Sequence, residues 1–229
     1  MLYSSGIRFK PRVLQRLFVA SFLICLYASL SACAHGPWDI DSYIQALERA
    51  ERAEYQKPDE VLSTLNIKPG IAIADIGAGS GYFTRRFAQE VGEAGKVFAI
   101  DVEQKMLDYN QKEINKLGLS NRTEFILTQP GDPSLQDHSV DLIFFCNAYH
   151  HLENHSAYLT KAKSALKTNG RIVIIDFYHD ERSGKLSFPK HHLVPKEQVI
   201  EHMKQAGLIL SKEHTFLPRQ YFLEFVPDN

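Results

Sequence analysis

Apolar runs alternate with amphipathic segments along most of the chain. Five runs rich in β-branched and aromatic residues predict strands, at 71–76, 96–101, 124–128, 140–146 and 171–177. Segments with apolar residues at helical spacing lie between or after them, at 82–91, 104–117, 156–166 and 196–206. Because parallel strands need long crossover connections, this alternation predicts a parallel sheet.

The last two predicted strands differ from the others. Segments 208–216 and 221–226 are separated only by the corner Leu217-Pro218-Arg219, so we expect them to pair antiparallel. The whole pattern predicts an α/β fold, a Rossmann-like seven-stranded and mostly parallel sheet with an antiparallel C-terminal strand pair and helices on both faces.

A helical segment precedes the first strand. Apolar residues recur at helical spacing between Tyr43 and Ala53, and Lys57-Pro58 is expected to end this helix. A second short helix is predicted over Pro58–Leu65, because proline is favoured in the first turn of a helix.

The N-terminus has the pattern of a targeting segment. Basic residues without any acidic partner are followed by the almost wholly apolar run 17–30 and then by the small residues Ser31 and Ala32. This order predicts an export signal over residues 1–32. A permanent transmembrane helix is the less favoured alternative, because the run is shorter than the roughly 20 residues that a spanning helix needs.

The residues Leu30-Ser31-Ala32-Cys33 resemble the lipobox of bacterial lipoproteins, in which cleavage leaves a lipid-modified cysteine at the new N-terminus. The resemblance implies an exported protein of the bacterial cell envelope, associated with the membrane through lipid at Cys33, residues 33–37 as a tether and 38–229 as the functional domain. The alternative is that Cys33 follows a signal sequence by coincidence.

Net charge and cysteine content argue against several classes of partner and site. The formal net charge is −1, and removal of residues 1–32 would take away four basic residues and make it −5, without any basic tract in the remainder. Nucleic acid is therefore not an expected partner. Of the three cysteines only Cys146 lies beyond the leader and the lipobox, which excludes a disulfide framework and a thiolate metal site.

The sequence contains two pairs of adjacent histidines that could carry chemistry, His150-His151 and His191-His192. His191-His192 lie in the aperiodic segment 179–195, which suits a loop over a substrate, and exposure to solvent is favoured over metal binding for them. We predict no metal site.

The stretch 73–83, IADIGAGSGYF, carries the strongest chemical signal. An apolar strand runs into Gly77-Ala78-Gly79-Ser80-Gly81 and then into a predicted helix. Such a turn allows a ligand to approach the backbone and is expected to present free amide groups to it. The dinucleotide fingerprint G-x-G-x-x-G would need glycine at position 82, where Tyr82 stands, so an NAD-dependent oxidoreductase is disfavoured.

The spacing G-x-G-x-G preceded by Asp75 resembles motif I of class I S-adenosylmethionine-dependent methyltransferases. The resemblance extends over residues 55–227, through QKPDEVL, GKVFAID, VDLIFFCNAYHHL and QYFLEF, and the nearest branch is that of ubiquinone/menaquinone biosynthesis. It implies S-adenosyl-L-methionine as cofactor and methyl transfer to a small-molecule or lipid-type substrate.

The resemblance also implies which residues bind the cofactor. They are Asp75, Gly77, Ala78, Gly79, Gly81 and Tyr82 at the first turn, Asp101 and Val102 after the second strand, Gly131 and Asp132 after the third, and Asn147 after the fourth. Asp101 would accept hydrogen bonds from the ribose hydroxyls and could equally cap the next helix. Asp132 would accept from the adenine amino group, although Pro130-Gly131-Asp132-Pro133 is also strong turn chemistry.

His150 and His151 follow the fourth predicted strand at the end where open α/β sheets bind ligands. Either is a candidate general base, and the alternative is that both only cap or pack beside the next helix. Asn147 is expected to contact the methionine part of the cofactor.

A non-catalytic role is the main alternative to an enzyme. The basic residues before the apolar run predict that the domain is translocated, whereas S-adenosylmethionine is made in the cytosol. A membrane-anchored lipoprotein that keeps the methyltransferase fold as a binding module would resolve this conflict. The sequence contains no signal for an oligomeric state.

Overall fold

The computed structural model describes residues 39–186 and 189–228. The predicted signal sequence 1–32, Cys33 and the tether 33–37 lie outside the described residues. Ile40–Asn229 form one compact unit. Among the described helices, none combines the length and the apolar character needed to cross a membrane.

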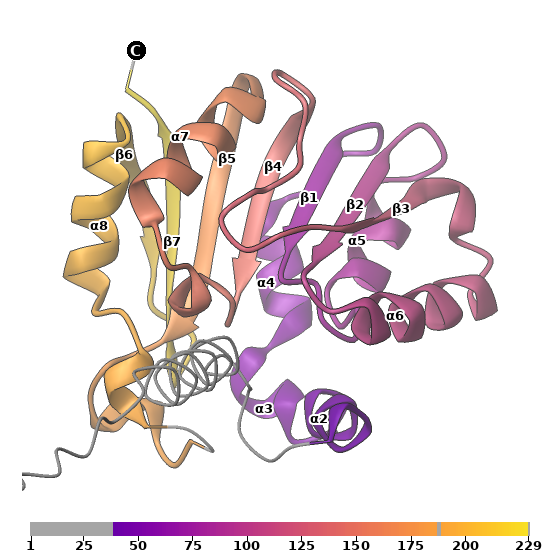
Figure 1. Cartoon of the computed structure of the whole chain (residues 1–229), viewed down its shortest axis with the longest axis horizontal. Helices are drawn as coiled ribbons and strands as arrows, with labels where there is room; N and C mark the ends of the chain where they lie inside the picture. The colour runs from indigo at the N-terminus through magenta and orange to yellow at the C-terminus, as the bar shows by residue number, and fades with distance from the viewer. Residues whose placement is uncertain (1–38, 187–188, 229) are drawn as a thin grey trace, which may run out of the picture. The chain divides into compact units, whose positions relative to one another are not determined.

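One seven-stranded sheet forms the centre of this unit, with the strand order β3-β2-β1-β4-β5-β7-β6 (Figure 1). The strands are β1 (Ala72–Ile76), β2 (Lys96–Asp101), β3 (Thr123–Leu127), β4 (Val140–Cys146), β5 (Leu166–Phe177), β6 (Leu208–His214) and β7 (Gln220–Pro227). Strands β1 to β5 pair parallel, whereas β7 pairs antiparallel with both β5 and β6. The predicted fold is confirmed, including the antiparallel C-terminal pair.

Apolar side chains cover both faces of the central strands. In β4, Leu142 and Phe144 pack into one cluster with helices α4 (Pro58–Leu65), α5 (Thr84–Glu90) and α6 (Gln104–Lys116). Ile143 and Phe145 of the same strand pack into a second cluster with α7 (His155–Ala165) and α8 (Lys196–Gln205). Successive strand residues point to opposite faces, so a continuous apolar run is what a sheet buried between two helical layers requires.

The segment before the sheet differs from the prediction. It forms two helices, α2 (Ile40–Leu47) and α3 (Arg52–Gln56), instead of one helix. The Arg52 guanidinium donates to the backbone carbonyl of Leu47 (3.0 Å), and it thereby satisfies a carbonyl group left open at the end of α2. The chain can therefore bend between the two helices.

Two other boundaries moved. The helix expected from Tyr82 starts at Thr84, because residues 77–83 are used for the turn, and β5 starts at Leu166 rather than Arg171. The segment 179–195 contains the short 3-10 turns η3 (Glu181–Ser183) and η4 (Lys190–His192), and η1 (Ser120–Arg122) and η2 (Tyr149–His151) lie before β3 and after β4.

Candidate functional site

The carboxyl ends of β1, β2, β4 and β5 meet at one edge of the sheet, which lies toward α2 and α3 in Figure 1. Two of the following turns pack against each other. A Cβ added to Gly77, after β1, would lie 2.5 Å from the Cβ of Ala148, after β4. The first and fourth strands thus bring their polar termini together, as the sequence predicted.

The glycine turn after β1 is held by bonds within the protein. The amides of Gly77 and Ala78 donate to the Ile100 carbonyl of the neighbouring strand β2, at 2.8 and 3.0 Å. The amide of Gly79 donates to the Asp101 carboxylate at 2.7 Å. The expectation that these amides are free for a ligand was wrong, because β2 ends beside the turn and supplies the acceptors.

Backbone conformation explains the three glycines of the turn. Gly77, Gly79 and Gly81 have φ values of 68°, 53° and 85°, a region that L side chains rarely adopt. A Cβ at Gly81 would meet the Asn110 side chain at 2.0 Å, whereas the nearest neighbours of a Cβ at Gly79 would be Leu47 of α2 at 3.4 Å and the Gly77 carbonyl oxygen at 3.9 Å. Space beside the turn is therefore greatest at Gly79.

Asp101 ends β2 beside this turn. Asp101 is only 9 % exposed, and its carboxylate accepts hydrogen bonds from the amides of Gly79 and Glu103 (3.0 Å). Burial raises the pKa of Asp101, and the hydrogen bonds from these amides oppose that rise. A carboxylate has about four lone-pair positions, so Asp101 keeps capacity to accept from a ligand's hydroxyl groups.

Asp75 lies deeper, at the end of β1. Its carboxylate accepts from the Thr84 hydroxyl at 2.6 Å, and Asn110 of α6 donates to the same hydroxyl at 3.1 Å. Burial raises the pKa of Asp75 to about 7, with the Asp101 charge adding to the rise. Asp75 therefore ties the strand to the start of α5.

Tyr82 follows the turn with its ring between two guanidinium groups. Arg52 and Arg86 lie 4.0 and 4.2 Å from the ring centroid. The Tyr82 hydroxyl is buried and has no hydrogen-bond partner among the described residues. A buried polar atom of this kind carries an energetic cost that a bound ligand could relieve.

Leu47 at the end of helix α2 and Glu48 directly after it lie beside the glycine turn, which the sequence did not predict. Glu48 accepts from the Ser80 hydroxyl (2.5 Å) and forms an ion pair with Arg85 (2.7 Å), while Leu47 is the nearest atom group to Gly79. The only sequence signal was the polar face of the lead-in helix, which does not reveal its partners.

Val102 and the turn after β3 border Asp101. The amide of Thr128 donates to the Asp101 carbonyl (3.0 Å), and Val102 is 51 % exposed. Asp132 accepts from the Ser134 amide within the turn (2.8 Å) and forms an ion pair with Lys161 of helix α7 (3.2 Å). The Ser134 amide lowers the pKa of Asp132, and Gly131 beside it has open space around its Cβ position.

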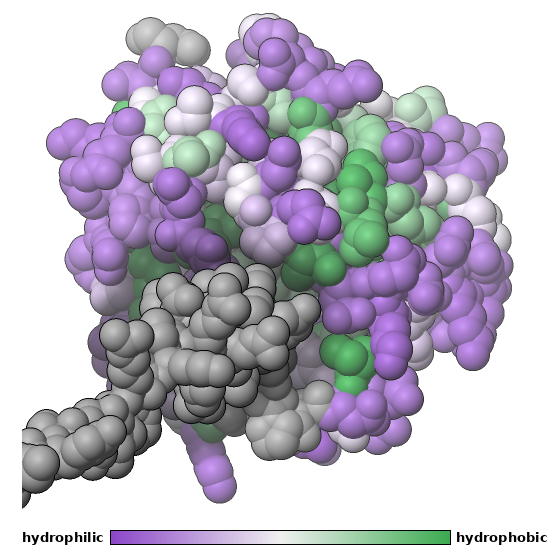
Figure 2. All heavy atoms as spheres, in the orientation of Figure 1, coloured by the Kyte–Doolittle hydropathy of each residue, from purple (hydrophilic) through white to green (hydrophobic). Residues whose placement is uncertain are grey.

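Exposed apolar surface is limited on the face shown in Figure 2, where small hydrophobic areas lie between hydrophilic ones. The large apolar side chains with the greatest exposure are Val102, Leu127, Leu117, Ile209, Tyr43 and Leu210. Two of these, Val102 and Leu127, flank the end of the β2–β3 pair, where Leu127 pairs with Asp101.

The two histidines after β4 have different surroundings in the structure. His150 donates from Nδ1 to the Asp176 carboxylate at 2.9 Å, and its backbone amide donates to the same carboxylate at 3.2 Å. The two side chains are 2 % and 0 % exposed. His151 is exposed, with its ring 4.1 Å from that of His150. Asp176, the penultimate residue of β5, completes a buried carboxylate–imidazole pair that no sequence spacing indicated.

Asn147, which follows β4, is held by hydrogen bonds to β5 and β7. It has a φ of 56°, its amide donates to the Ile175 carbonyl (2.9 Å), and its side-chain oxygen accepts from Gln220 of β7 (2.5 Å). Gln220 is fully buried and was not among the predicted site residues.

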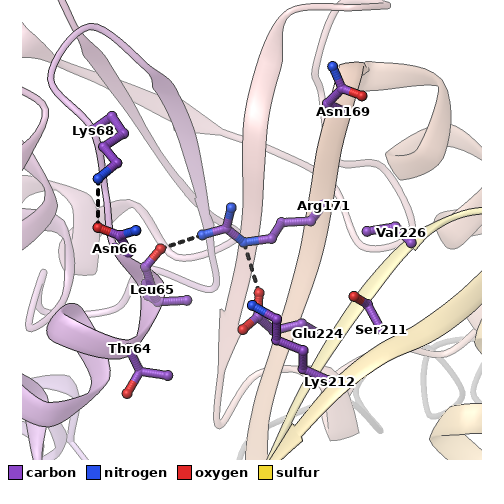
Figure 3. Close-up of a pocket in the computed structure, with 10 residues that line it drawn as sticks. All are labelled: Thr64, Leu65, Asn66, Lys68, Asn169, Arg171, Ser211, Lys212, Glu224 and Val226. Carbon is purple, nitrogen blue, oxygen red and sulfur yellow. Dashed lines mark hydrogen bonds and ion pairs between the residues drawn. The ribbon is translucent and has the colours of Figure 1, made fainter.

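Away from this edge, a cavity of about 450 Å³ lies beside the amino-terminal part of β5 (Figure 3). Arg171 crosses it, pairing with Glu224 (3.0 Å) and donating to the Leu65 carbonyl (2.6 Å). Its lining residues include none of the predicted site residues. No group of three or more potential metal ligands occurs within 39–186 and 189–228.

Comparison with known proteins places the geometry in context. A family model described as a methyltransferase domain matches residues 67–214, which is more than half of the chain. A solved S-adenosylmethionine-dependent methyltransferase from Aquifex aeolicus is 28 % identical, with a TM-score of 0.75, over 82 % of this chain and 98 % of that one.

Two relatives are ubiquinone/menaquinone biosynthesis C-methyltransferases. The protein from Pseudoalteromonas translucida is 24 % identical over 60 % of this chain and 51 % of its own length. The protein from Shewanella frigidimarina is 24 % identical over 64 % of this chain and 56 % of its own length. The chain thus spans about half the length of the curated relatives it matches.

Proposed function

The chain belongs to the methyltransferase-domain family and is an S-adenosylmethionine-dependent methyltransferase, and we propose that it transfers the methyl group to a small-molecule or lipid-type substrate with His150 as the general base. The comparisons favour an enzyme over the alternative of a non-catalytic binding module. The observation that carries the proposal is the buried His150–Asp176 pair, located at the same sheet edge as the Asp101–Gly79 contact.

The residues at this edge fit S-adenosylmethionine. Asp101 keeps lone pairs for the ribose hydroxyls after accepting two backbone amides. The buried Tyr82 hydroxyl lacks a partner among the described residues, and Gly79 has room for a close approach. We place the remaining predicted contacts, Asp75, Gly77, Ala78, Gly81, Val102, Gly131, Asp132 and Asn147, around the same ligand, with Asn147 at its methionine part.

When bound, S-adenosylmethionine supplies a methyl group on a sulfonium sulfur, which a nucleophile attacks in line. The protein's task is to position the nucleophile, exclude water and accept its proton. Asp176 accepts the Nδ1 proton of His150, so the lone pair of the imidazole is on Nε2. The carboxylate also stabilises the imidazolium that forms when Nε2 takes the proton.

Two observations support the proposed substrate class. The two curated relatives named above are called ubiquinone/menaquinone biosynthesis C-methyltransferases. The Tyr55 and Phe177 rings lie 5.9 Å apart in a tilted arrangement at the end of β5, and Arg219 lies 4.8 Å from the Tyr55 ring. Aromatic faces and a guanidinium at this position suit an apolar or aromatic substrate with a polar ring substituent.

Label transfer tests the proposal. The purified full chain is incubated with methyl-labelled S-adenosylmethionine and with extracted membrane quinones and phospholipids, and label in the organic phase is measured. We expect transfer by the wild type and a strong loss in His150→Ala. Calorimetry of the wild-type protein measures binding of S-adenosylhomocysteine and of NAD alongside the transfer assay. A folded wild type that binds no S-adenosylhomocysteine would overturn the proposal.

We further propose that the protein is exported and held at the bacterial cell envelope by lipid at Cys33. The support is the basic, apolar and small-residue order of residues 1–32 followed by the lipobox-like Leu30-Ser31-Ala32-Cys33. An anchor would hold the site beside membrane-borne substrates. Mass spectrometry of the native protein should show a lipid-modified N-terminus at Cys33, and an unmodified Met1 start in the soluble fraction would refute it.

A further inference from the structure

Four polar side chains form a continuous hydrogen-bonded series that runs from helix α3 to the sheet edge where β1, β2, β4 and β5 end. Arg52 donates from Nε to Gln56 Oε1 at 2.9 Å. Gln56 donates from Nε2 to Gln220 Oε1 at 3.2 Å, and Gln220 donates from Nε2 to Asn147 Oδ1 at 2.5 Å. We call these four residues the amide series. Arg52, Gln56 and Gln220 are 8 %, 0 % and 0 % exposed, so each polar end needs a protein partner.

Arg52 determines the direction of the whole series. A guanidinium only donates hydrogen bonds, so Gln56 must turn its oxygen toward Arg52 and its NH2 group away. Each following amide has one accepting and one donating end, so the same orientation passes to Gln220 and then to Asn147. Asn147 must therefore present its NH2 group, and not its carbonyl oxygen, at the sheet edge.

Independent contacts fix the two ends of the series. Arg52 also donates to the Leu47 carbonyl and lies 4.0 Å over the Tyr82 ring, so its position does not depend on Gln56. At the other end, the backbone amide of Asn147 donates to Ile175 in β5. Because both ends are held independently, the series determines only which way the side-chain amides of Gln56, Gln220 and Asn147 are oriented.

Gln56 donates one further hydrogen bond from the same NH2 group. Its Nε2 also donates to the sulfur of Cys146, the last residue of β4. Burial raises the pKa of the Cys146 thiol to about 12, so the sulfur stays protonated at neutral pH. The thiol therefore adds no negative charge that could compete for Arg52.

We propose that Arg52 is a positioning residue that acts through Gln56 and Gln220 to make Asn147 a hydrogen-bond donor toward the carboxylate of the cofactor's methionine part. This inference rests on the proposed function, which places Asn147 beside that part of S-adenosylmethionine. A donor there attracts a carboxylate, whereas a carbonyl oxygen would repel it. The series thus makes affinity for the amino-acid end of the ligand depend on Arg52 of helix α3.

Gln56→Glu tests the direction of the series. The new carboxylate still accepts from Arg52 but cannot donate, so Gln220 must turn its NH2 group toward it and its oxygen toward Asn147. Asn147 then turns its own oxygen toward the ligand. Calorimetry should show about ten- to a hundredfold weaker binding of S-adenosylhomocysteine. Binding of 5′-methylthioadenosine, which lacks the amino-acid part, should stay within about twofold of wild type.

A double-mutant cycle separates orientation from general disruption. In the Asn147→Ala background the reversed group is absent, so adding Gln56→Glu should change S-adenosylhomocysteine affinity by less than about twofold. Gln205→Glu, an exposed change on α8, is the matched control and should leave both affinities unchanged. Should Gln56→Glu fail to fold, Arg52→Met keeps the apolar stem, removes the donor and carries the same comparison of the two ligands.

The possible results distinguish the proposal from its alternatives. Weaker binding of S-adenosylhomocysteine alone supports the amide series. Equal losses for both ligands, no loss for either, or an additive cycle with Asn147→Ala would overturn it. A folded wild type that binds neither ligand would overturn the proposed function itself, which is a different result.

Discussion

The carboxylate of Asp101 accepts the backbone amide of Gly79 at 2.7 Å, so the residue that ends β2 holds the turn that follows β1. The same carboxylate is the one expected to bind the ribose hydroxyls. If Asp101 has both roles, its removal should lower both the stability of the turn and the affinity for the ligand.

Asp101→Ala should weaken S-adenosylhomocysteine binding by about 1.5–3 kcal/mol, because a buried charged acceptor is lost. It should also lower the free energy of unfolding of the unliganded protein, since the Gly79 amide loses its acceptor. Calorimetry and urea unfolding measure the two effects. Asp59→Ala, an exposed change on α4, is the control. Unchanged affinity in Asp101→Ala would remove this residue from the site.

Gly77→Ala should destabilise the protein more than Gly79→Ala. Both substitutions carry the cost of a left-handed backbone, roughly 1 kcal/mol. Only the Gly77 substitution also places a methyl group 2.5 Å from the Ala148 Cβ, whereas at Gly79 the nearest atom is 3.4 Å away and lies on a flexible leucine. Urea unfolding compares the variants, and equal stabilities would contradict the packing of the two turns.

His150→Ala should reduce turnover by about a hundredfold or more and leave S-adenosylhomocysteine affinity nearly unchanged, because a general base typically contributes 10²–10⁴-fold. Asp176→Asn should also slow turnover, since it removes the acceptor that fixes the imidazole orientation. His151→Ala, the exposed neighbour, serves as the matched comparison and should have a small effect. If all three variants melt earlier yet methylate at the wild-type rate, both histidines are structural and catalysis rests on positioning.

Asp75→Asn should flatten the pH dependence of stability. Burial raises the pKa of Asp75 from 3.8 to about 7, so between these values the folded chain binds a proton that the unfolded chain releases. Stability from this residue is present at low pH and is lost as the pH rises toward 7, by at most about 1.4 kcal/mol per pH unit. Urea unfolding at about pH 4.5 and about pH 7 checks it. The exposed variant Asp59→Asn should keep the wild-type slope, and a wild-type slope in Asp75→Asn would refute the assignment.

Local patterns in the sequence determined the fold and the class of chemistry. The alternation of apolar runs and helical segments predicted all seven strands, because period and length are visible within a few residues. The glycine spacing after β1, preceded by Asp75, carried the resemblance that implied the cofactor class, since a turn and the strand that enters it are contiguous in sequence. The break between α2 and α3 escaped prediction, because the carbonyl at the end of α2 is satisfied by the Arg52 side chain rather than by a helix-ending residue.

Tertiary structure alone decided how the site is held. The sequence offered His150 and His151 as equivalent neighbours, and only the end of β5 gives His150 a buried carboxylate partner in Asp176. The amide series likewise joins Gln56 and Gln220, which are 164 positions apart, through contacts that exist only when α3 packs beside β7. Hydrogen-bond partners are set by distances between distant segments, and residue identity along the chain does not encode those distances directly.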